Sequence, residues 1–584
     1  MGNGSVSNLT LGTAGHIDHG KTWLVRALTG KDTDRLPEER SRGISIDLGY
    51  APLDLPGGRR LSVIDVPGHE RFIRNMVAGA SGIDLFLLVI DATEGARPQT
   101  HEHLAILRLL GVDAGVVAVT KADAADPALV EVVVAEAREL VPGAEVVPVS
   151  AKTGEGLDEL RAALEAAAAR REHTALLGAA RLYVDRAFTL RGIGTVVTGT
   201  LWSGSIGEGD ELRAEPAGLD VRVRSVQVHD LPLERAEAGQ RVALGVPGIE
   251  RDALRRGDAL IEAGAYPVSY RLDIELEELE PIADHARLQV HHGTAEIPAR
   301  LVRVGERFGQ LRLATPVVAA RGDHVVLRAS TTLGGGRVLD PAPPRAPDPA
   351  RLELLATDDP ASIVRALVHE PLGAADLTSR ALLSPTQLAA GLAAVEQADG
   401  WHFSAEWLDQ ARREARTRLA LRAEAAPLDP GLPAGDLLAS APWAEAVLPL
   451  LELEQRDGKV YLPGAAASLG DKAVDAQALE ARLAEAGLEP TPVEDADLAR
   501  FLEAEGRLVR VGDGLAVGIE PYEKAKRALV EECEQAGKIT LARFRDLMGI
   551  SRRPAQLLLE RFDVDGVTRR VGDERVLRRS TARG

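Results

Sequence analysis

The sequence reads Gly15-His16-Ile17-Asp18-His19-Gly20-Lys21-Thr22 near its start, with two glycines separated by four residues and then Lys and a hydroxyl residue. An apolar run, Leu9 to Ala14, precedes this stretch, and a helical pattern, Trp23 to Leu28, follows it, which is the context that a phosphate-binding loop requires. Glycines let the backbone N–H groups face a polyphosphate, Lys21 can reach the terminal phosphates, and the Thr22 hydroxyl can hold Mg²⁺. The following helix adds the positive end of its dipole. The stretch therefore predicts a nucleotide site, Gly15 to Thr22.

Around this loop, strand-like and helix-like segments alternate over the first 175 residues, and the last helical pattern runs from Leu157 to Arg171. Such alternation predicts a parallel sheet covered by helices on both faces, with the ligand at the carboxyl ends of the strands. The expected strands are Leu9–Ala14, Leu61–Asp65, Leu85–Asp91, Gly115–Thr120 and Glu145–Ser150.

Two segments have the properties of nucleotide switches. Asp65-Val66-Pro67-Gly68-His69 ends the second apolar run. An Asp at a strand end can hold Mg²⁺ through water, and the N–H of Gly68 can contact a γ-phosphate, so the loop can sense that phosphate. Upstream, the polar stretch from Arg40 to Ile46 could fold over the nucleotide with the Ser45 hydroxyl on Mg²⁺.

Two further segments indicate which base is bound. Thr120-Lys121-Ala122-Asp123 follows an apolar strand, and Ser150-Ala151-Lys152 follows the next one. The Asp123 carboxylate can accept hydrogen bonds from N1–H and from the exocyclic amine of guanine, a pattern that adenine does not offer. We therefore expect GTP and GDP, with Mg²⁺, as the bound cofactors.

Composition narrows the class of protein. At 584 residues, the chain is expected to fold as about four domains. Its net charge of −19 argues against a uniformly basic nucleic-acid coat but permits local basic patches. A single cysteine, Cys533, forms no intramolecular disulfide and suits a reducing compartment. Without a signal peptide or a long apolar run, a soluble cytoplasmic protein with no membrane partner is expected.

These motifs resemble those of the translational GTPases, the family of elongation factor Tu and initiation factor two. The resemblance implies that His69 positions the attacking water on the ribosome and that Lys121 and Asp123 recognise guanine. Two residues depart from the family pattern, because Ser45 replaces Thr and Thr120 replaces Asn. Ser45 keeps a hydroxyl ligand for Mg²⁺, whereas Thr120 lacks the amide that ties this loop to the phosphate loop, which would loosen nucleotide binding.

From Arg181 to about Asp340 the pattern changes to short β-rich runs separated by glycine turns. This spacing predicts two small β-barrels, divided near Ala263.

Four segments in and before the barrels resemble the bacterial selenocysteine-specific elongation factors: Asp47–Tyr50, Val184–Phe188, Ala238–Leu244 and Leu333–Asp340. The resemblance implies an aminoacyl pocket lined by Tyr50, Asp185, Arg186 and Arg241. Selenocysteine is an anion at neutral pH, so two guanidiniums would favour it over serine or a mostly protonated cysteine.

The C-terminal third is helical and is interrupted by short β-like pieces at a spacing of 50 to 65 residues, which predicts four winged-helix units. Residues 341–519 hold 16 Lys/Arg and 29 Asp/Glu, whereas residues 520–584 hold 15 and 11. Only the last unit is therefore suited to a polyanion. We expect helices at Tyr522–Gln535, Leu541–Met548 and Ser551–Phe562, then a hairpin over 568–577. The residues expected to contact RNA are Arg552, Arg553, Arg569, Arg570 and Arg575.

The complete prediction is a multidomain protein with an α/β P-loop GTPase domain, two β-barrels and C-terminal tandem winged helices. Its expected activity is ribosome-stimulated GTP hydrolysis, and its partners are selenocysteinyl-tRNA, an mRNA hairpin and the ribosome, bound by a monomer. Two alternatives remain, a translational GTPase with another cargo and a winged-helix nucleic-acid regulator with a GTPase switch. The expected boundaries are 1–175 for the GTPase domain, 180–262 and 263–340 for the barrels, 341–349 for a Pro-rich linker, and 350–404, 405–464, 465–519 and 520–584 for the winged helices.

Overall fold

The computed structural model describes residues 9–33, 48–68, 77, 82–171, 178–229 and 231–578. The chain consists of two compact units, Met1–Ser404 and Ala405–Gly584, which are described separately. None of the helices within the described ranges is long and apolar enough to cross a bilayer.

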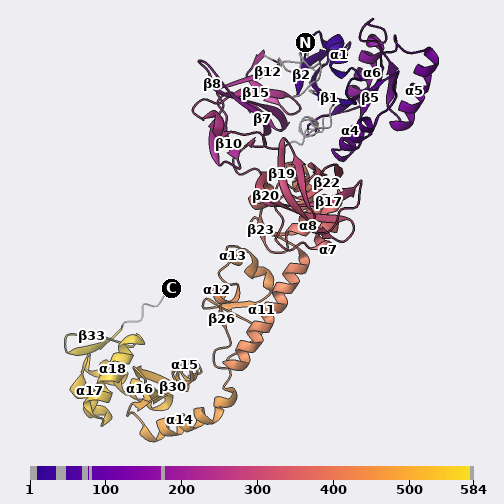
Figure 1. The fold of residues 1–584 in the computed structure, drawn as a ribbon. Coiled ribbons are helices and arrows are strands. Elements are labelled where there is room, and N and C mark those ends of the chain that lie inside the picture. Colours follow the sequence, from indigo (N-terminus) through magenta and orange to yellow (C-terminus); the bar gives the residue numbers. More distant parts are fainter. Residues whose placement is uncertain are drawn as a thin grey trace. The chain divides into compact units, whose positions relative to one another are not determined.

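The N-terminal domain is a six-stranded sheet in the order β2-β3-β1-β4-β5-β6, in which β2 alone runs antiparallel to its neighbour. Two apolar clusters, one on each face, bury the sheet under helices, as predicted (Figure 1). β2 was not among the expected strands. The elements are β1 (Leu9–Gly15), α1 (Lys21–Thr29), β2 (Gly49–Asp54), β3 (Arg60–Asp65), β4 (Leu85–Asp91), α4 (Pro98–Leu109), β5 (Gly115–Thr120), α5 (Pro127–Leu140), β6 (Glu145–Pro148) and α6 (Leu157–Arg170).

The second domain is a β-structure whose strands share one apolar core. Eight strands form one antiparallel sheet in the order β11-β10-β16-β7-β8-β15-β12-β13, and β9 pairs with β14. The strands are β7 (Arg181–Leu190), β8 (Gly194–Ser203), β9 (Ser205–Gly207), β10 (Glu211–Glu215), β11 (Leu219–Arg222), β12 (Ser225–Val228), β13 (Leu231–Leu233), β14 (Arg235–Glu237), β15 (Arg241–Gly245) and β16 (Ala259–Ile261), with a short 3-10 helix, η2 (Arg251–Ala253).

The third domain is a closed barrel of six strands with its own apolar core. Its strand order is β17-β20-β19-β18-β21-β22. The strands are β17 (Val268–Glu278), β18 (Arg287–His292), β19 (Ala295–Val304), β20 (Phe308–Val318), β21 (His324–Arg328) and β22 (Thr332–Asp340).

A buried ion cluster joins the second domain to the barrel. Arg181 on β7 donates two hydrogen bonds to Asp323, at 2.6 and 2.8 Å, and His292 lies 3.1 Å from the same carboxylate. The exposed fractions of these three side chains are 1 or 2 %. The guanidinium of Arg181 also lies 5.0 to 5.5 Å from the rings of Tyr183, Trp202 and Tyr266. A buried charge is tolerated only when it is paired, so this cluster fixes how the two domains pack.

The first winged helix packs on the barrel. Val304, Phe308 and Leu339 of the barrel share an apolar core with α7 and α8. In the Pro-rich segment, the carbonyls of Pro343 and Pro344 accept hydrogen bonds from barrel side chains, each at 3.1 Å. The elements of this unit are α7 (Pro349–Ala356), α8 (Pro360–Leu367), β23 (Leu372–Gly373), α9 (Ala374–Ser379), α10 (Pro385–Leu392), β24 (Glu396–Ala398) and β25 (Trp401–Phe403).

Beyond Ser404, three more units repeat the pattern of helices followed by a small three-stranded sheet. The second contains α11 (Ala405–Ala425), β26 (Leu432–Pro433), α12 (Ala434–Leu437), α13 (Ala444–Val447), η3 (Leu448–Leu451), β27 (Glu454–Arg456) and β28 (Lys459–Tyr461). The third contains η4 (Gly470–Lys472), α14 (Ala473–Ala486), β29 (Thr491–Pro492), α15 (Ala496–Ala504), β30 (Leu508–Gly512) and β31 (Leu515–Gly518).

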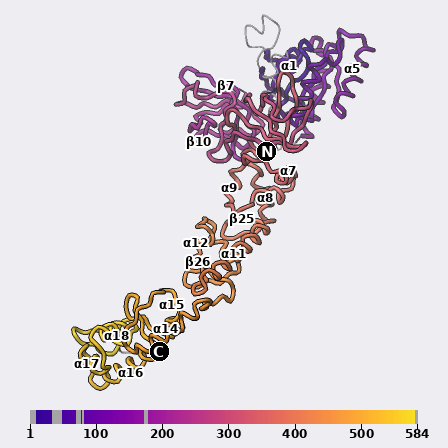
Figure 2. Tube along the Cα trace, turned by 60° about the horizontal axis from the view of Figure 1, so that its bottom comes forward, coloured from indigo at the N-terminus to yellow at the C-terminus, as the bar shows by residue number. Residues whose placement is uncertain are grey.

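The fourth unit contains α16, α17 and α18, which lie together in both views, followed by a two-stranded wing (Figure 1 and Figure 2). Its core also includes Val509, Val511 and Val517 of the third unit, so the two units share one apolar core. The predicted fold class is confirmed. The elements are α16 (Ile519–Ala536), β32 (Ile539–Thr540), α17 (Leu541–Met548), α18 (Arg552–Val564), β33 (Thr568–Val571) and β34 (Glu574–Leu577).

Candidate functional site

The predicted phosphate loop connects the end of β1 to the start of α1. Gly15 has φ +130°, and a Cβ there would lie 2.2 Å from the carbonyl oxygen of Val89, so the position requires glycine. Gly20, at φ +85°, turns the chain into α1. Lys21 Nζ donates to the carbonyl of Gly15 at 2.9 Å and to that of His16 at 2.7 Å. The loop therefore has the curled backbone and the lysine that a polyphosphate site needs.

Burial sets the protonation of the loop. It lowers the pKa of Lys21 to about 8, against the opposing effects of Asp65 and Asp18. Burial likewise lowers the pKa of His19 to about 4 and, together with the charge of Lys21, lowers the pKa of His16 below its usual value. Both histidines are neutral at physiological pH, so the loop's positive charge is concentrated on Lys21.

The predicted magnesium ligands Thr22 and Asp65 lie together. The Thr22 hydroxyl donates to Asp65 at 2.8 Å, and Thr13 and Thr33 donate to the same carboxylate at 2.9 and 2.8 Å. Burial raises the pKa of Asp65, although these hydroxyls oppose the effect. A buried carboxylate among hydroxyls is a donor set that suits a hard divalent cation.

Gly68 lies against the phosphate loop, because a Cβ there would meet Lys21 Nζ at 2.2 Å. This contact brings the loop after β3 to the point where a terminal phosphate would lie. The other predicted members of this region, Ser45 and His69, lie outside the described residues.

The predicted base pocket lies at the ends of β5 and β6. Ser150 donates to the carboxylate of Asp123 at 2.7 Å and accepts from the N–H of Thr153 at 3.1 Å. Lys121, at φ +57°, pairs with Asp91 at 2.7 Å. Ala151 and Lys152 follow Ser150 in a turn. The sequence analysis missed Asp91, although its position as an acidic residue at the end of β4 was a usable signal.

Thr120 corrects one expectation. Its hydroxyl donates to the carbonyl of His19 in the phosphate loop at 2.7 Å, and its side chain is buried. With Thr in place of Asn, a hydrogen bond still joins the loop after β5 to the phosphate loop, since a hydroxyl can donate where an amide would. The expected loosening of nucleotide binding has no basis in this contact.

The four predicted aminoacyl-pocket residues lie together between β2 of the first domain and strands β7 and β15 of the second. Arg241 pairs with Asp185, and its guanidinium lies 3.4 Å from the ring centroid of Tyr50. Arg186 donates to the carbonyl of Leu48 at 3.0 Å, and its guanidinium lies 5.6 Å from the same ring. Thr198 also donates to Asp185, at 2.6 Å.

A cavity of about 300 Å³ opens beside these residues, lined by Tyr50, Arg186 and Arg241. Lys31 and His229 also line it, and sequence reasoning missed both because nothing in their local pattern marks them. Two arginines and a lysine therefore line this cavity, and Asp185 pairs with one of the arginines, Arg241.

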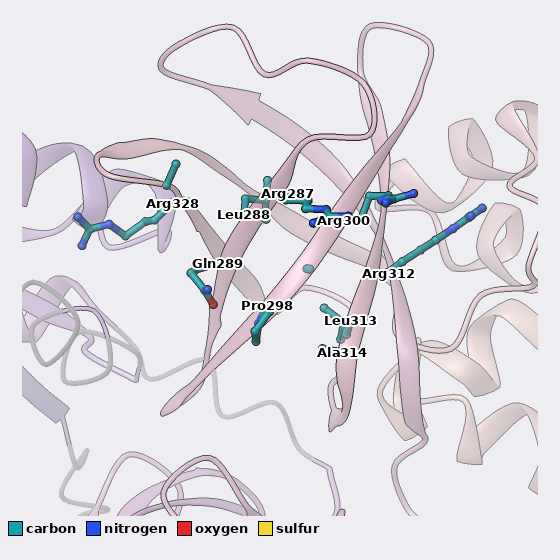
Figure 3. Close-up of a pocket in the computed structure, with 11 residues that line it drawn as sticks. Arg287, Leu288, Gln289, Pro298, Arg300, Arg312, Leu313, Ala314 and Arg328 are labelled. Atoms are coloured by element: carbon teal, nitrogen blue, oxygen red, sulfur yellow. The ribbon is translucent and has the colours of Figure 1, made fainter.

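A second cavity lies on the barrel surface, with a volume of about 640 Å³ (Figure 3). Arg287, Arg300 and Arg312 are aligned across β18, β19 and β20 by the strand register, and all three are exposed. Arg328 also lines the cavity but is 3.6 Å from Glu102 of α4. Within the described ranges, none of the three aligned arginines forms an ion pair. Because like charges on paired strands destabilise a sheet, this row indicates an anionic partner.

In the last winged-helix unit, four of the five predicted RNA-contacting arginines are exposed. Arg552 and Arg553 begin α18, and Arg569 and Arg570 lie on β33 of the wing. Arg575 corrects the prediction, because it is 6 % exposed and its Nε donates to Asp563 at 2.8 Å. Period-two alternation along β34 turns Arg575 toward the core, where it braces the wing against α18.

Comparison with family models gives four matches. They are the elongation factor Tu GTP-binding domain over residues 7–170, elongation factor Tu domain 2 over 194–261, the selenocysteine-specific elongation factor β-barrel domain over 269–345, and the elongation factor SelB winged helix over 531–577.

Full-length relatives and solved structures agree with these matches. The selenocysteine-specific elongation factor of Desulfomicrobium baculatum is 35% identical, over 97% of this chain and 99% of that protein. The factor of Escherichia coli K12 is also 35% identical, over 98% and 99%. A crystal structure of a bacterial selenocysteine-specific elongation factor superposes with a TM-score of 0.73 at 28% identity, covering 98% of this chain and 100% of that one. The Methanococcus maripaludis SelB structure in complex with the GTP analogue GppNHp gives a TM-score of 0.51 at 28% identity, over 57% of this chain and 80% of that one.

Proposed function

The chain belongs to the family of selenocysteine-specific elongation factors, and from this premise we propose that it carries selenocysteinyl-tRNA to the ribosomal A site at UGA codons. A hairpin in the selenoprotein mRNA recruits it through the last winged helix. The protein is a translational GTPase. It acts in the cytoplasm as a monomer, where the ribosome aligns it for GTP hydrolysis.

The nucleotide chemistry depends on the loops at the carboxyl edge of the first sheet. The phosphate loop and Lys21 hold the phosphates of GTP, and Asp123 with Lys121 and Ser150 holds guanine. Mg²⁺, when bound, neutralises phosphate charge, and Thr22, Asp65 and Ser45 are its ligands. The hydrogen bond of 2.8 Å from the Thr22 hydroxyl to the buried Asp65 carboxylate supports this assignment. His69 orients the attacking water.

Selection of the amino acid attached to the tRNA depends on the cavity beside Tyr50, and the residues that line this cavity are the main support for the proposal. A selenolate is an anion, and Arg186, Arg241 and Lys31 line the cavity, where their positive charges can attract it. Serine is neutral and a cysteine thiol is mostly protonated at pH 7, so neither gains the same charge interaction. The Asp185 carboxylate and the Tyr50 ring hold the Arg241 guanidinium in one orientation.

The tRNA body supplies the anion for the barrel surface. Arg287, Arg300 and Arg312 present three positive charges in a row across neighbouring strands, and arginines bind phosphate oxygens without reading the base. These contacts contribute affinity for the tRNA that does not depend on the attached amino acid. Discrimination between selenocysteine and serine therefore depends on the cavity.

The proposal is tested by comparing one tRNA species charged with selenocysteine and with serine. The GTP-loaded protein is expected to prefer the selenocysteinyl form by about 100-fold, which is about 2.7 kcal/mol. We expect Arg241→Ala to remove most of this preference. The substitution removes a positively charged side chain from the wall of the cavity and leaves the Asp185 carboxylate without its ion-pair partner. Affinities would be measured by fluorescence titration of both tRNA forms, with GTP affinity measured in parallel.

Arg235→Ala is the matched control, since Arg235 is exposed and pairs with Asp210 at 3.1 Å. It removes one positive charge from the same domain and should leave the preference intact. Equal loss of tRNA and GTP binding in Arg241→Ala would contradict the pocket assignment. Equal binding of the two tRNA forms by the unmodified protein would favour a translational GTPase with another cargo.

The proposed contact between the mRNA hairpin and the wing is tested by substituting two wing arginines. We expect the double variant Arg569→Ala/Arg570→Ala to weaken binding of the mRNA hairpin and to reduce the slope of log affinity against log salt by about 1.5, because two phosphate contacts are lost. Filter binding over a salt series measures both quantities. Arg500→Ala, an exposed arginine of the third unit paired with Asp497, should change neither. If duplex DNA bound better than the hairpin, the wing would belong to a different kind of regulator.

A further inference from the structure

One face of α4 contacts the phosphate loop. The amide oxygen of Gln99 accepts a hydrogen bond from the N–H of Ile17 at 3.3 Å, and Nδ1 of His103 accepts one from the N–H of Gly15 at 3.1 Å. Gln99 and His103 are four residues apart, so they share a face of the helix. Two loop N–H groups are therefore held by side chains from a different element.

The bond to His103 is well protected. His103 is fully buried, and burial together with the charge of Lys21 lowers its pKa to about 3, so its ring stays neutral. The N–H of Gly15 then requires the tautomer that has its proton on Nε2 and a free lone pair on Nδ1. On the other side of Gly15, the carbonyl accepts a hydrogen bond from Lys21 Nζ at 2.9 Å. The backbone of Gly15 is thus held at its N–H by α4 and at its carbonyl by the lysine that contacts phosphate.

We propose that Gln99 and His103 are positioning residues that hold the phosphate loop in its nucleotide-binding shape and thereby determine how long GDP stays bound. Gly15 lies at positive φ. Because glycine adopts positive and negative φ about equally well, a contact from outside the loop must select this conformation. Removing the acceptor leaves a buried N–H without a partner, which costs more than an ordinary hydrogen bond contributes. A loop that has lost this bond samples other shapes, and nucleotide release accelerates.

The inference goes beyond cargo delivery, since it concerns only the nucleotide cycle. Glu102, the neighbour of His103 on α4, contacts the barrel instead, because its carboxylate accepts a hydrogen bond from the Thr332 hydroxyl at 3.0 Å. Residues of the same helix therefore provide both the test and its control.

The experiment measures dissociation of a fluorescent N-methylanthraniloyl GDP from the full-length protein by stopped flow. His103→Asn keeps an acceptor oxygen on Cγ, where Nδ1 is attached, whereas His103→Gln moves the oxygen one bond further from the backbone. We expect His103→Gln to accelerate GDP release by about tenfold and His103→Asn to stay within about twofold of the unmodified protein. Gln99→Leu should accelerate release by about fivefold. Glu102→Gln should not change it.

The two His103 variants distinguish a positioning role of the side chain from a packing role. Asn is smaller than Gln and leaves the larger cavity at a buried site, so packing alone would make His103→Asn the more damaged variant. A faster release in His103→Asn than in His103→Gln, or an unchanged rate in both, would overturn the proposal. Since no tRNA, messenger or ribosome is present, failure here would leave the delivery function untouched.

Discussion

An Asp123→Asn variant is expected to lose affinity for GTP by about 10⁴-fold and to gain affinity for xanthosine triphosphate. The carboxylate accepts hydrogen bonds from both N1–H and the exocyclic amine of guanine, whereas an amide offers one acceptor and one donor. The donor then faces the guanine amine, which leaves both donors without an acceptor. Xanthine has a carbonyl in place of that amine, so it pairs with the amide. Because Ser150 holds the Asp123 side chain at 2.7 Å, the variant should keep its orientation.

Equilibrium titration with both nucleotides measures this exchange of preference. Asp126→Asn is the matched control, because Asp126 undergoes the same chemical change three residues further on, where it caps α5 by accepting from the N–H of Ala128. Asn is an equally good cap, so the control should bind GTP normally. If Asp123→Asn retained GTP affinity, the guanine site would have to lie elsewhere.

An Asp323→Asn variant is expected to lose about 3–5 kcal/mol of stability in the second domain and the barrel. The change removes the negative charge that Arg181 and His292 share, and it leaves a fully buried guanidinium without a counterion. Urea unfolding followed by tryptophan fluorescence measures the effect, since Trp202, one of the five tryptophans, lies 6.1 Å from the His292 ring. Asp220→Asn, which alters an exposed pair with Arg213, should cost less than about 1 kcal/mol.

The buried cluster of Arg181, His292 and Asp323 also makes the stability of the protein depend on pH. Burial raises the pKa of Asp323, but Arg181 and His292 outweigh it and hold the pKa well below its usual range. A folded-state pKa below the unfolded value means that the stability is fully present above the unfolded pKa of about 4 and is lost as the pH falls below it. The unmodified protein should therefore lose stability below about pH 4 more steeply than Asp323→Asn. Parallel pH profiles for the two proteins would contradict the role of this carboxylate.

Sequence reasoning recovered the elements whose signal is local. The phosphate loop, the apolar strands β1, β3, β4, β5 and β6, and the helices of the last unit follow from glycine spacing and hydrophobic periodicity. It missed β2, because the edge strand is short and contains Pro52 and Gly49, which both disfavour strand assignment.

Contacts between distant residues could not be predicted in this way. The hydroxyl of Thr120 reaches the carbonyl of His19, 101 residues earlier, and His103 reaches Gly15, 88 residues earlier. Both depend on how the sheet stacks its strands. Arg575 belongs to a basic sequence segment, but only the pairing of the wing with α18 decides that it faces Asp563 rather than solvent.

What the sequence determined by itself is therefore the set of chemical groups and their local geometry: a curled phosphate loop, an acidic residue at a strand end, Asp123 after another strand and a basic final unit. These depend on the backbone conformations and periodicities of a few consecutive residues. The tertiary structure alone decided which groups meet, including Arg241 on Tyr50, three arginines in one row on the barrel, and Arg181 with Asp323. Such pairings are set by domain packing and strand register, and the free energy of burial that selects them is spread over the whole core.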